Sequence, residues 1–174
     1  MPMSIVSAVV DGKVNHMAVG WLNRVNFKPP MVGVSLGKTH YTNRGIREHK
    51  TFGVSIPDVG LLKAADYAGL VSGSKVDKSR LFEIFYGEVE NAPMVTDCPL
   101  TMACRVVQTI ELPTNEIFIG EIIESYCAEE FIAGNAPDMD KLKLFTLTIP
   151  DNRYWAVGEC IGKAWSAGKG YKIS

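Results

Sequence analysis

The side chains best suited to bind a charged, partly flat ligand are concentrated in two segments, residues 15–42 and residues 72–78. The first segment (NHMAVGWLNRVNFKPPMVGVSLGKTHYT) carries amides, hydroxyls and a tryptophan, and the second (SGSKVDK) carries hydroxyls and two lysines. Hydroxyls and cations hold phosphate groups, and a tryptophan offers a flat surface to a ring. Together the two segments indicate a site for a phosphorylated ligand with a planar ring.

The strand expected over residues 14–21 places one amide on an otherwise apolar face. The odd-numbered residues share that face: Asn15, Met17, Val19 and Trp21. A straight strand separates Asn15 from Trp21 by roughly 20 Å, so the two contact opposite ends of a long ligand unless Gly20 bends the strand. The alternative is a structural face, in which Asn15 completes a hairpin and Trp21 covers the core.

Thr42 is predicted to cap the N-terminus of a short helix that runs to His49. The first turn of that helix holds Arg44 and no acidic residue, so a cation stands at the positive end of the helix dipole. A bound phosphate would make this arrangement favourable by accepting hydrogen bonds from the Thr42 hydroxyl and the open first-turn amides. The alternative is an Arg44 side chain that points away into water.

The loop over residues 72–78 follows a segment with helical spacing and is the second candidate anion site. Its lysines act as point cations toward phosphate, and Gly73 allows the backbone to approach a ligand closely. The alternative is a solvated connection in which Asp77 caps a following helix.

Length and composition are typical of one domain spanning residues 1–174, with 47% hydrophobic and 21% charged residues. The net charge of −1 argues against nucleic-acid binding, and no apolar run reaches the roughly 18 residues of a membrane span. The four cysteines and three histidines lack metal-ligand spacing, which favours reduced core thiols in a cytoplasmic protein without a metal site. No Ser-His-Asp set can be assembled, so the chemistry is expected to belong to a bound cofactor.

The expected elements are mostly strands. They are Ser4 to Val10, Val14 to Trp21, Met31 to Leu36, Thr51 to Pro57, Leu100 to Glu111, Glu116 to Tyr126 and Arg153 to Ile161. Helices are expected over 42–49 and 58–71, with Asp58 as the N-cap of the second, and 135–140 is expected to be a polar loop. This pattern predicts a mainly β, antiparallel split barrel with a few short helices. No dinucleotide fingerprint or nucleotide-triphosphate loop is present.

The order of short motifs resembles the flavin reductase-like FMN-binding split barrels, and most closely their flavoredoxin branch. The motifs are V-G-V-S-L at 32–36, T-N-R-G-I at 42–46, F-G-V-S-I at 52–56, V-S-G-S-K-V-D-K at 71–78 and F-I-G-E-I at 118–122. The resemblance implies a homodimer that binds FMN near the subunit interface. It implies that the cofactor contacts Asn15, Met17, Trp21, Ser35, Leu36, Thr42, Asn43, Ser72, Lys78 and Trp155.

Within that set, the resemblance gives Thr42 and Asn43 the phosphate, and it leaves the C-terminal aromatic contact open between Tyr154 and Trp155. Many relatives have a histidine where this chain reads Thr-Asn-Glu at 114–116, so Asn115 offers only a neutral hydrogen bond there. The implied activity is a flavin reductase-like oxidoreductase with NAD(P)H as a donor. The alternatives are a non-catalytic electron carrier and a cofactor-free interaction module.

Three aromatic residues near the C-terminus, Trp155, Trp165 and Tyr171, stand in a segment with little evident structure. Exposed aromatic side chains on a partly hydrophobic chain are expected to be buried against another subunit. This pattern supports the homodimer.

Overall fold

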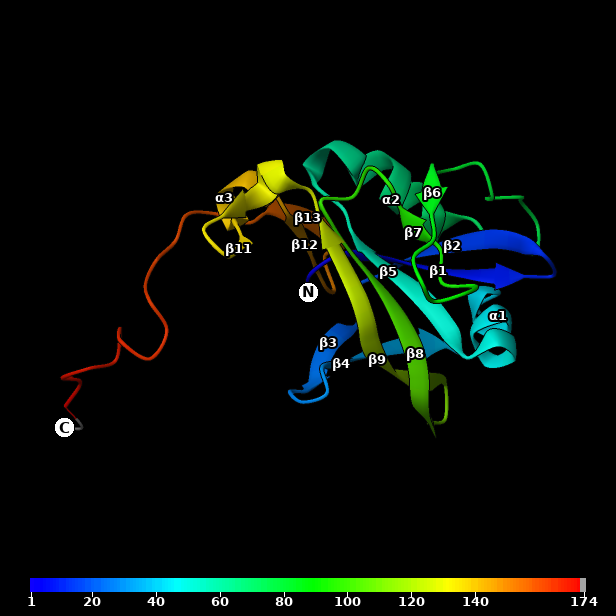
Figure 1. The fold of residues 1–174 in the computed structure, drawn as a ribbon, viewed down its shortest axis with the longest axis horizontal. Helices are drawn as coiled ribbons and strands as arrows, with labels where there is room; N and C mark the ends of the chain where they lie inside the picture. The colour runs from blue at the N-terminus through cyan, green and yellow to red at the C-terminus, as the bar shows by residue number, and fades with distance from the viewer. Residues whose placement is uncertain (173–174) are drawn as a thin grey trace.

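A computed structural model describes residues 1–172, and its centre is a seven-stranded antiparallel sheet in the order β2-β1-β5-β8-β9-β4-β3 (Figure 1). The strands are β1 (Ser4–Val10), β2 (Lys13–Val19), β3 (Leu22–Asn26), β4 (Met31–Gly37), β5 (Thr51–Ile56), β8 (Leu100–Glu111) and β9 (Asn115–Cys127). The mainly β, antiparallel split barrel predicted from the sequence is confirmed.

The first hairpin forms at the Asp11-Gly12 pair, as predicted. Asp11 has φ 50° and Gly12 has φ 76°, and two successive left-handed residues are the signature of a type I′ turn. The hairpin fixes the register in which Ala8 pairs with Asn15 and Val6 pairs with Met17. The turn therefore decides which face of β2 each side chain occupies.

The second strand is shorter than predicted. It ends at Val19, and the chain bends at Gly20 and Trp21 before it enters β3, which the sequence did not predict. The two edge strands of the sheet, β2 and β3, are thus consecutive in the chain but not hydrogen-bonded to each other. This open seam between them is the split of the barrel. The barrel interior is filled by apolar side chains that include Val6, Val34, Phe52 and Phe118.

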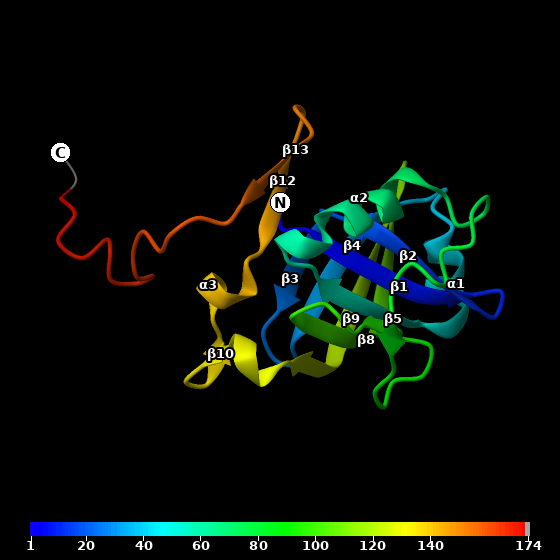
Figure 2. The ribbon, with the colours of Figure 1, turned by 90° about the horizontal axis from the view of Figure 1, so that it is seen from above.

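Two helices flank the sheet (Figure 2). Helix α1 (Thr42–His49) follows β4, and helix α2 (Leu62–Leu70) packs over β2 after the 3-10 turn η1 (Val59–Leu61). Asp58 is the N-cap of η1, because its carboxylate accepts a hydrogen bond from the Leu61 amide at 3.1 Å. The prediction that Thr42 caps α1 is wrong: the N-cap position is Tyr41, and no side chain caps this helix.

The C-terminal third departs from the predicted boundaries. It holds β10 (Ile132–Ala133), β11 (Ala136–Pro137), α3 (Met139–Leu142), β12 (Phe145–Thr148) and β13 (Arg153–Ala156), with the 3-10 turn η2 (Glu129–Phe131) before them. The expected loop at 135–140 therefore contains a strand and a helix start. The expected strand from Arg153 to Ile161 stops at Ala156, because only residues 153–156 pair with β12. A short pair, β6 (Ile84–Phe85) and β7 (Met94–Val95), packs against β5 and β8, and Val95 shares an apolar cluster with α2.

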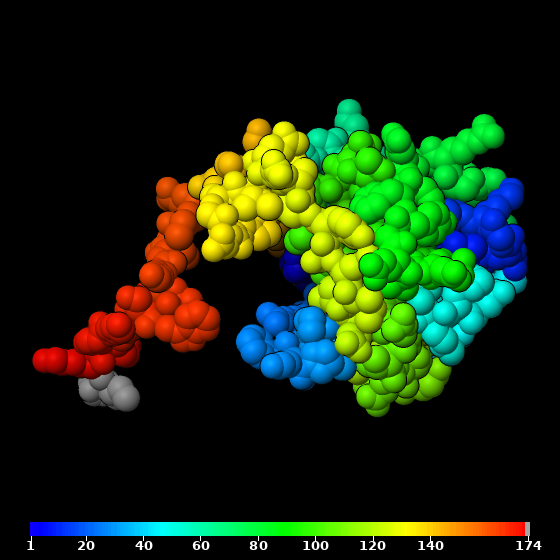
Figure 3. Space-filling model, viewed as in Figure 1, coloured from blue at the N-terminus to red at the C-terminus, as the bar shows by residue number. Residues whose placement is uncertain are grey.

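Residues 157–172 form an arm that leaves the body of the protein (Figures 1 and 3). Three of its apolar side chains are almost fully exposed: Ile161 (97%), Trp165 (98%) and Tyr171 (85%). Figure 3 shows an open gap between this arm and the β3 hairpin. The arm therefore buries almost none of its apolar surface within one chain.

The cysteine prediction holds for two of the four residues. Cys98 and Cys104 are buried, whereas Cys127 is partly exposed and Cys160 lies exposed on the arm. All four thiols are free. Within residues 1–172, no three His, Cys, Asp or Glu side chains gather as a metal site, and no helix has the length and apolar character to cross a membrane.

Candidate functional site

A continuous trough runs along the seam of the barrel. It consists of three adjoining hollows with volumes of about 330, 300 and 260 Å³. Asn15, Gly73 and Lys78 border both the first and the second hollow, and Met17 and His40 border both the second and the third. The trough therefore joins the loop at 72–78 to the bend after β2.

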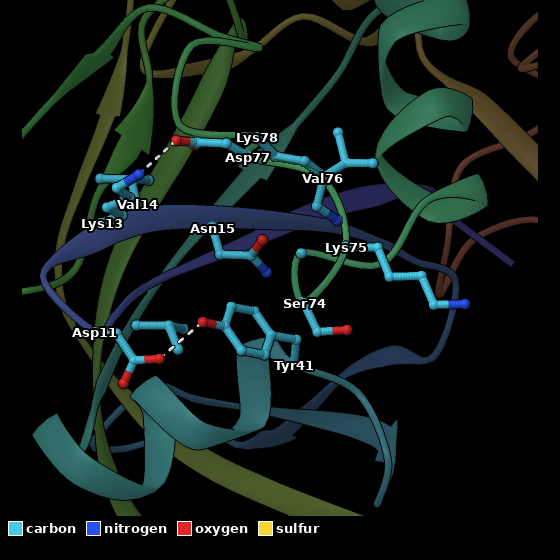
Figure 4. Close-up of a pocket in the computed structure, with 12 residues that line it drawn as sticks. Asp11, Lys13, Val14, Asn15, Tyr41, Ser74, Lys75, Val76, Asp77 and Lys78 are labelled. Atoms are coloured by element: carbon cyan, nitrogen blue, oxygen red, sulfur yellow. Dashed lines mark hydrogen bonds and ion pairs between the residues drawn. The ribbon is translucent and has the colours of Figure 1, made fainter.

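Asn15 lies at the centre of the polar end of the trough (Figure 4). It is 4% exposed, and its Nδ2 donates to the Thr42 hydroxyl oxygen at 2.7 Å. Because Thr42 accepts this bond, its own hydroxyl proton stays available to donate to a ligand. Thr42 thus borders the second hollow as a side-chain donor and not as a helix cap.

The loop at 72–78 closes over Asn15. A Cβ atom on Gly73 would lie 2.0 Å from the Asn15 Oδ1 and 2.7 Å from the Tyr41 ring, so only glycine allows this approach. The Asp77 carboxylate accepts from Lys13 Nζ at 2.7 Å and ties the loop to the first hairpin (Figure 4). The Ser72 hydroxyl is bonded to Ser74 within the loop, at 2.9 Å between the two oxygens.

Lys78 is a buried cation at the junction of the two polar hollows. The residue is 3% exposed, and Nζ donates to the carbonyl oxygens of Ala68, in the last turn of α2, at 2.9 Å and of Val71, the C-cap of that helix, at 3.0 Å. Among residues 1–172, no carboxylate forms an ion pair with it. Burial lowers the pKa of Lys78 from 10.5 to about 8. The site therefore holds a desolvated ammonium that lacks an anionic partner.

The charge of Lys78 contributes to the lowered pKa of two histidines. His40 borders the second and third hollows, and burial and then the Lys78 charge lower its pKa. His16 points to the opposite face of β2, where its Nδ1 lies 2.7 Å from the Ser7 hydroxyl and its ring meets Phe82 edge-on. Burial, with a smaller contribution from Lys78, lowers the pKa of His16 to about 4. Both rings are therefore neutral at pH 7.

The third hollow forms the apolar end of the trough. Its walls are apolar side chains of the chain start, β2 and the segment after α3, together with Ser35, Leu36 and Gly37 of β4. The apolar residues are Met1, Met17, Val19, Trp21, Leu147 and Ile149. The Leu36 side chain is 1% exposed in the barrel core, so only its backbone faces the hollow. Trp21 is 47% exposed beyond the end of β2, where the bend at Gly20 brings it to this wall.

Two predicted contacts lie outside the trough. Asn43 is fully buried and donates to the Glu116 carboxylate and to the Gly37 carbonyl. Trp155 is 51% exposed on β13, and its indole N–H donates to the Thr148 hydroxyl at 3.1 Å. Tyr154, the alternative to Trp155, donates to Asp66 at 2.7 Å. One chain alone therefore brings neither Asn43 nor a C-terminal aromatic ring to the trough.

The start of α1 differs from the predicted anion site. Arg44 forms an ion pair with Asp11 at 3.0 Å, and the amides of Asn43 and Arg44 already donate to the carbonyls of His40 and Tyr41. Arg44 lines none of the three hollows, and its half-exposed side chain pairs with Asp11 rather than pointing freely into water. Among the described residues, the buried cation of the site that lacks a carboxylate partner is Lys78.

Sequence reasoning missed several lining residues, among them Met1, His40, Tyr41 and Leu147. His40 and Tyr41 lie in the turn between a predicted strand and the predicted helix. Their place in this turn was the sequence signal that could have identified them. Met1 and Leu147 meet because the Met1 ammonium donates to the Leu147 carbonyl at 2.9 Å. No local sequence pattern predicts a contact between residues 146 positions apart.

Comparison with known proteins places this geometry in a family. The family model of the flavin reductase like domain matches residues 1–148. The flavoredoxin structure from Methanosarcina acetivorans is 51% identical, with a TM-score of 0.95 over 97% of this chain and 91% of that one. The flavoredoxin of Desulfovibrio vulgaris (Miyazaki F) is 35% identical, with a TM-score of 0.89 over 97% and 92%. An NADH-dependent FAD reductase of Streptomyces globisporus is 26% identical over 70% of this chain and 68% of that protein. The chain is therefore a member of the flavin reductase-like family.

Proposed function

We propose that this protein is an FMN-binding electron carrier of the flavoredoxin type. The observation that carries the proposal is the trough, which joins a polar end around a buried, unpaired ammonium to an apolar end beside Trp21. A phosphorylated ring compound presents the same two ends. The match to the flavin reductase like domain over residues 1–148 supports a flavin as the cofactor, and the identity of 51% to a flavoredoxin over nearly the whole chain supports the carrier role.

The residues present fit FMN chemically. The Lys78 ammonium and the Thr42 hydroxyl donate to a phosphate or to electron-rich ring oxygens, and Gly73 leaves backbone room beside Asn15. The backbone of Ser35 to Gly37 and the Trp21 ring would line the flavin. Strand β2 is hydrogen-bonded to β1 on one edge only, so its other edge faces the seam with free backbone groups.

FMN would supply the electron transfer itself, and the protein would supply position and electrostatics. Lys78 favours negative charge at the polar end of the trough, because it is desolvated and lacks a carboxylate partner. The apolar wall of Met17, Trp21 and Leu147 excludes water from the other end. No residue of the trough needs to act as a nucleophile.

The relatives favour the carrier over the reductase, which the resemblance placed first. Two flavoredoxins cover 97% of the chain at 51% and 35% identity, whereas the relative named a reductase reaches 26% over 70%. Asn115 stands where many relatives have a histidine, and its amide donates to the Ser35 hydroxyl at 3.5 Å. Because an asparagine offers no cation to a nucleotide, this residue also supports the carrier.

Anaerobic reduction separates the two functions. The FMN-loaded protein is mixed with NADH or NADPH and, in parallel, with a chemically reduced low-potential electron-transfer protein, and flavin absorbance is followed. We expect fast bleaching by the reduced protein and slow or no bleaching by either nucleotide. Rapid, saturable bleaching by NADH or NADPH would establish the reductase instead.

We also propose that the carrier is a homodimer. The arm at 157–172 exposes Ile161, Trp165 and Tyr171, and the nearby β3 hairpin exposes Phe27 at 80%. A solvent-exposed apolar surface of this kind is expected to be covered by another subunit. Such a partner could also bring Trp155, or another aromatic ring, to the open apolar end of the trough. Sedimentation at micromolar concentration tests this directly, with a dimer expected and a stable monomer contradicting it.

A further inference from the structure

The most deeply buried carboxylate of the described residues belongs to Glu116, near the start of β9. It is 1% exposed, and it stands opposite Leu36 of β4 and Glu111 of β8 in the sheet. A buried carboxylate is stable only when charged and polar partners satisfy it. Its partners come from one face of α1.

Those partners are Asn43 and Arg47, which are four residues apart and therefore lie on the same side of the helix. Arg47 donates from Nε to Glu116 Oε2 at 3.0 Å and from its terminal nitrogen to Oε1. Asn43 Nδ2 donates to Glu116 Oε1 at 2.7 Å and to the Gly37 carbonyl at 3.0 Å. The amide of Asn43 has two protons, and both have protein acceptors.

The bonds of Asn43 end at the corner that borders the trough. Gly37 is the last residue of β4, and the corner over residues 37–42 lines both the second and the third hollow. Thr42, the neighbour of Asn43, holds Asn15 through the bond at 2.7 Å. A shift of Asn43 would therefore move the turn that carries His40 and displace the Thr42 hydroxyl.

We propose that Glu116, Asn43 and Arg47 form a bracket that positions this corner, and that Asn43 is a positioning residue rather than a ligand of the phosphate. The inference rests on the proposed binding of FMN. It assigns the predicted phosphate contact of Asn43 to a protein carboxylate, and it gives Glu116 an indirect part in cofactor binding.

A double-mutant cycle on FMN affinity tests the bracket. The variants are Asn43→Leu, Glu116→Met and the pair, which remove the polar atoms and keep side chains of similar length, with FMN and riboflavin titrated by fluorescence quenching. If both residues act through one bracket, each single change weakens FMN at least tenfold, and the pair weakens it no more than the larger single change. Riboflavin weakens by the same factor, because the corner borders both halves of the trough.

A direct phosphate contact gives the opposite pattern. The losses of Asn43→Leu and Glu116→Met would then multiply in the pair, and Asn43→Leu would weaken FMN while riboflavin binding stayed unchanged. Either result overturns the bracket. Wild-type protein that binds no FMN overturns the proposed function, and the role of the bracket with it, before any variant is made.

Two further variants separate positioning from general stability. Glu116→Gln keeps an acceptor for Asn43 but loses the charge pair with Arg47, so we expect a lower Tm and an FMN Kd within threefold of wild type. A tenfold loss of FMN affinity in this folded variant contradicts the bracket. The matched control is Glu111→Gln, which stands opposite Glu116 and pairs at the surface with Lys38 at 2.8 Å. It should change neither quantity, because exposed ion pairs contribute little.

Discussion

Lys78 offers the sharpest prediction, because its charge can be removed by mutation and by pH. The perturbation is Lys78→Met, which keeps the length of the side chain and removes the ammonium. At an effective dielectric of about 20, one charge about 5 Å from an anion contributes roughly 3 kcal/mol before salt screening. We therefore expect a loss of about 1–3 kcal/mol in FMN binding, or about 5- to 150-fold in Kd.

The pH dependence of wild-type binding follows from the lowered pKa of Lys78. Burial brings this pKa from 10.5 to about 8, so the free site carries its charge below pH 8 and loses it as the pH rises above 8. FMN affinity should be constant from pH 6.5 to 7.5 and fall by up to about tenfold per unit above pH 8, until the pKa of the bound state is reached.

The sign for stability without ligand is opposite to that for binding. The unfolded chain keeps the proton up to about pH 10.5, while the folded chain releases it near pH 8, so the unfolded state binds more protons in between. Between pH 8 and pH 10.5, the free energy of unfolding of the wild type should therefore rise by about 2–3 kcal/mol relative to that of Lys78→Met.

Fluorescence titrations at half-unit steps from pH 6.5 to 10 measure the binding, and urea unfolding measures the stability. Lys75→Met is the control, because Lys75 borders the same hollow with an exposed side chain that points away from Asn15 in Figure 4. A wild-type Kd that stays flat to pH 10, or equal Kd values for wild type and Lys78→Met, would refute the assignment of Lys78 to the cofactor site.

Three other changes test separate parts of the account. Gly73→Ala places a Cβ atom 2.0 Å from Asn15 Oδ1, so the loop must shift and FMN affinity should fall at least tenfold. An unchanged FMN affinity would contradict the close approach of the loop to Asn15. His16 has its pKa lowered from 6.5 to about 4, so the folded state binds fewer protons in this window and wild type should lose about 2–3 kcal/mol in urea unfolding as the pH falls from 6.5 to 4. His16→Met should lack that loss, and equal pH profiles would exclude His16 as the cause. A chain that ends at Ala156 should sediment as a monomer, and a dimer of unchanged affinity would show that the arm is not part of the interface.

Much of the fold was predictable because its signals are local. The Asp-Gly pair between two alternating segments requires a hairpin, and the long strands β8 and β9 carry enough alternation to be found. Strand β3 was missed because its side chains Asn23, Arg24 and Asn26 are exposed, so its place depends on backbone pairing with β4 and leaves no apolar pattern. Strand β12 was missed for another reason: Phe145 to Thr148 alternates apolar and polar residues, but four residues are too few for the alternation to stand out.

The site was predictable in its members more than in their roles. Thr42 was found from the start of α1 and Asn43 from the family resemblance, but their partners, Asn15 and Glu116, stand 27 and 73 residues away in the chain. Capping rules describe a helix in isolation, and they cannot anticipate a long-range acceptor that competes for the same side chain. Lys78 was found from a loop motif, whereas its burial depends on carbonyls at the end of α2.

The central claim is that the trough along the barrel seam binds one FMN, with the phosphate bound at its polar end. The most direct measurement is an equilibrium titration of the flavin-free wild-type protein with FMN and with riboflavin at pH 7. The account predicts one FMN per chain with a Kd of about 1 μM or tighter, and riboflavin binding at least about tenfold weaker. Equal affinities for the two flavins, or no saturable binding up to about 100 μM FMN, would contradict it.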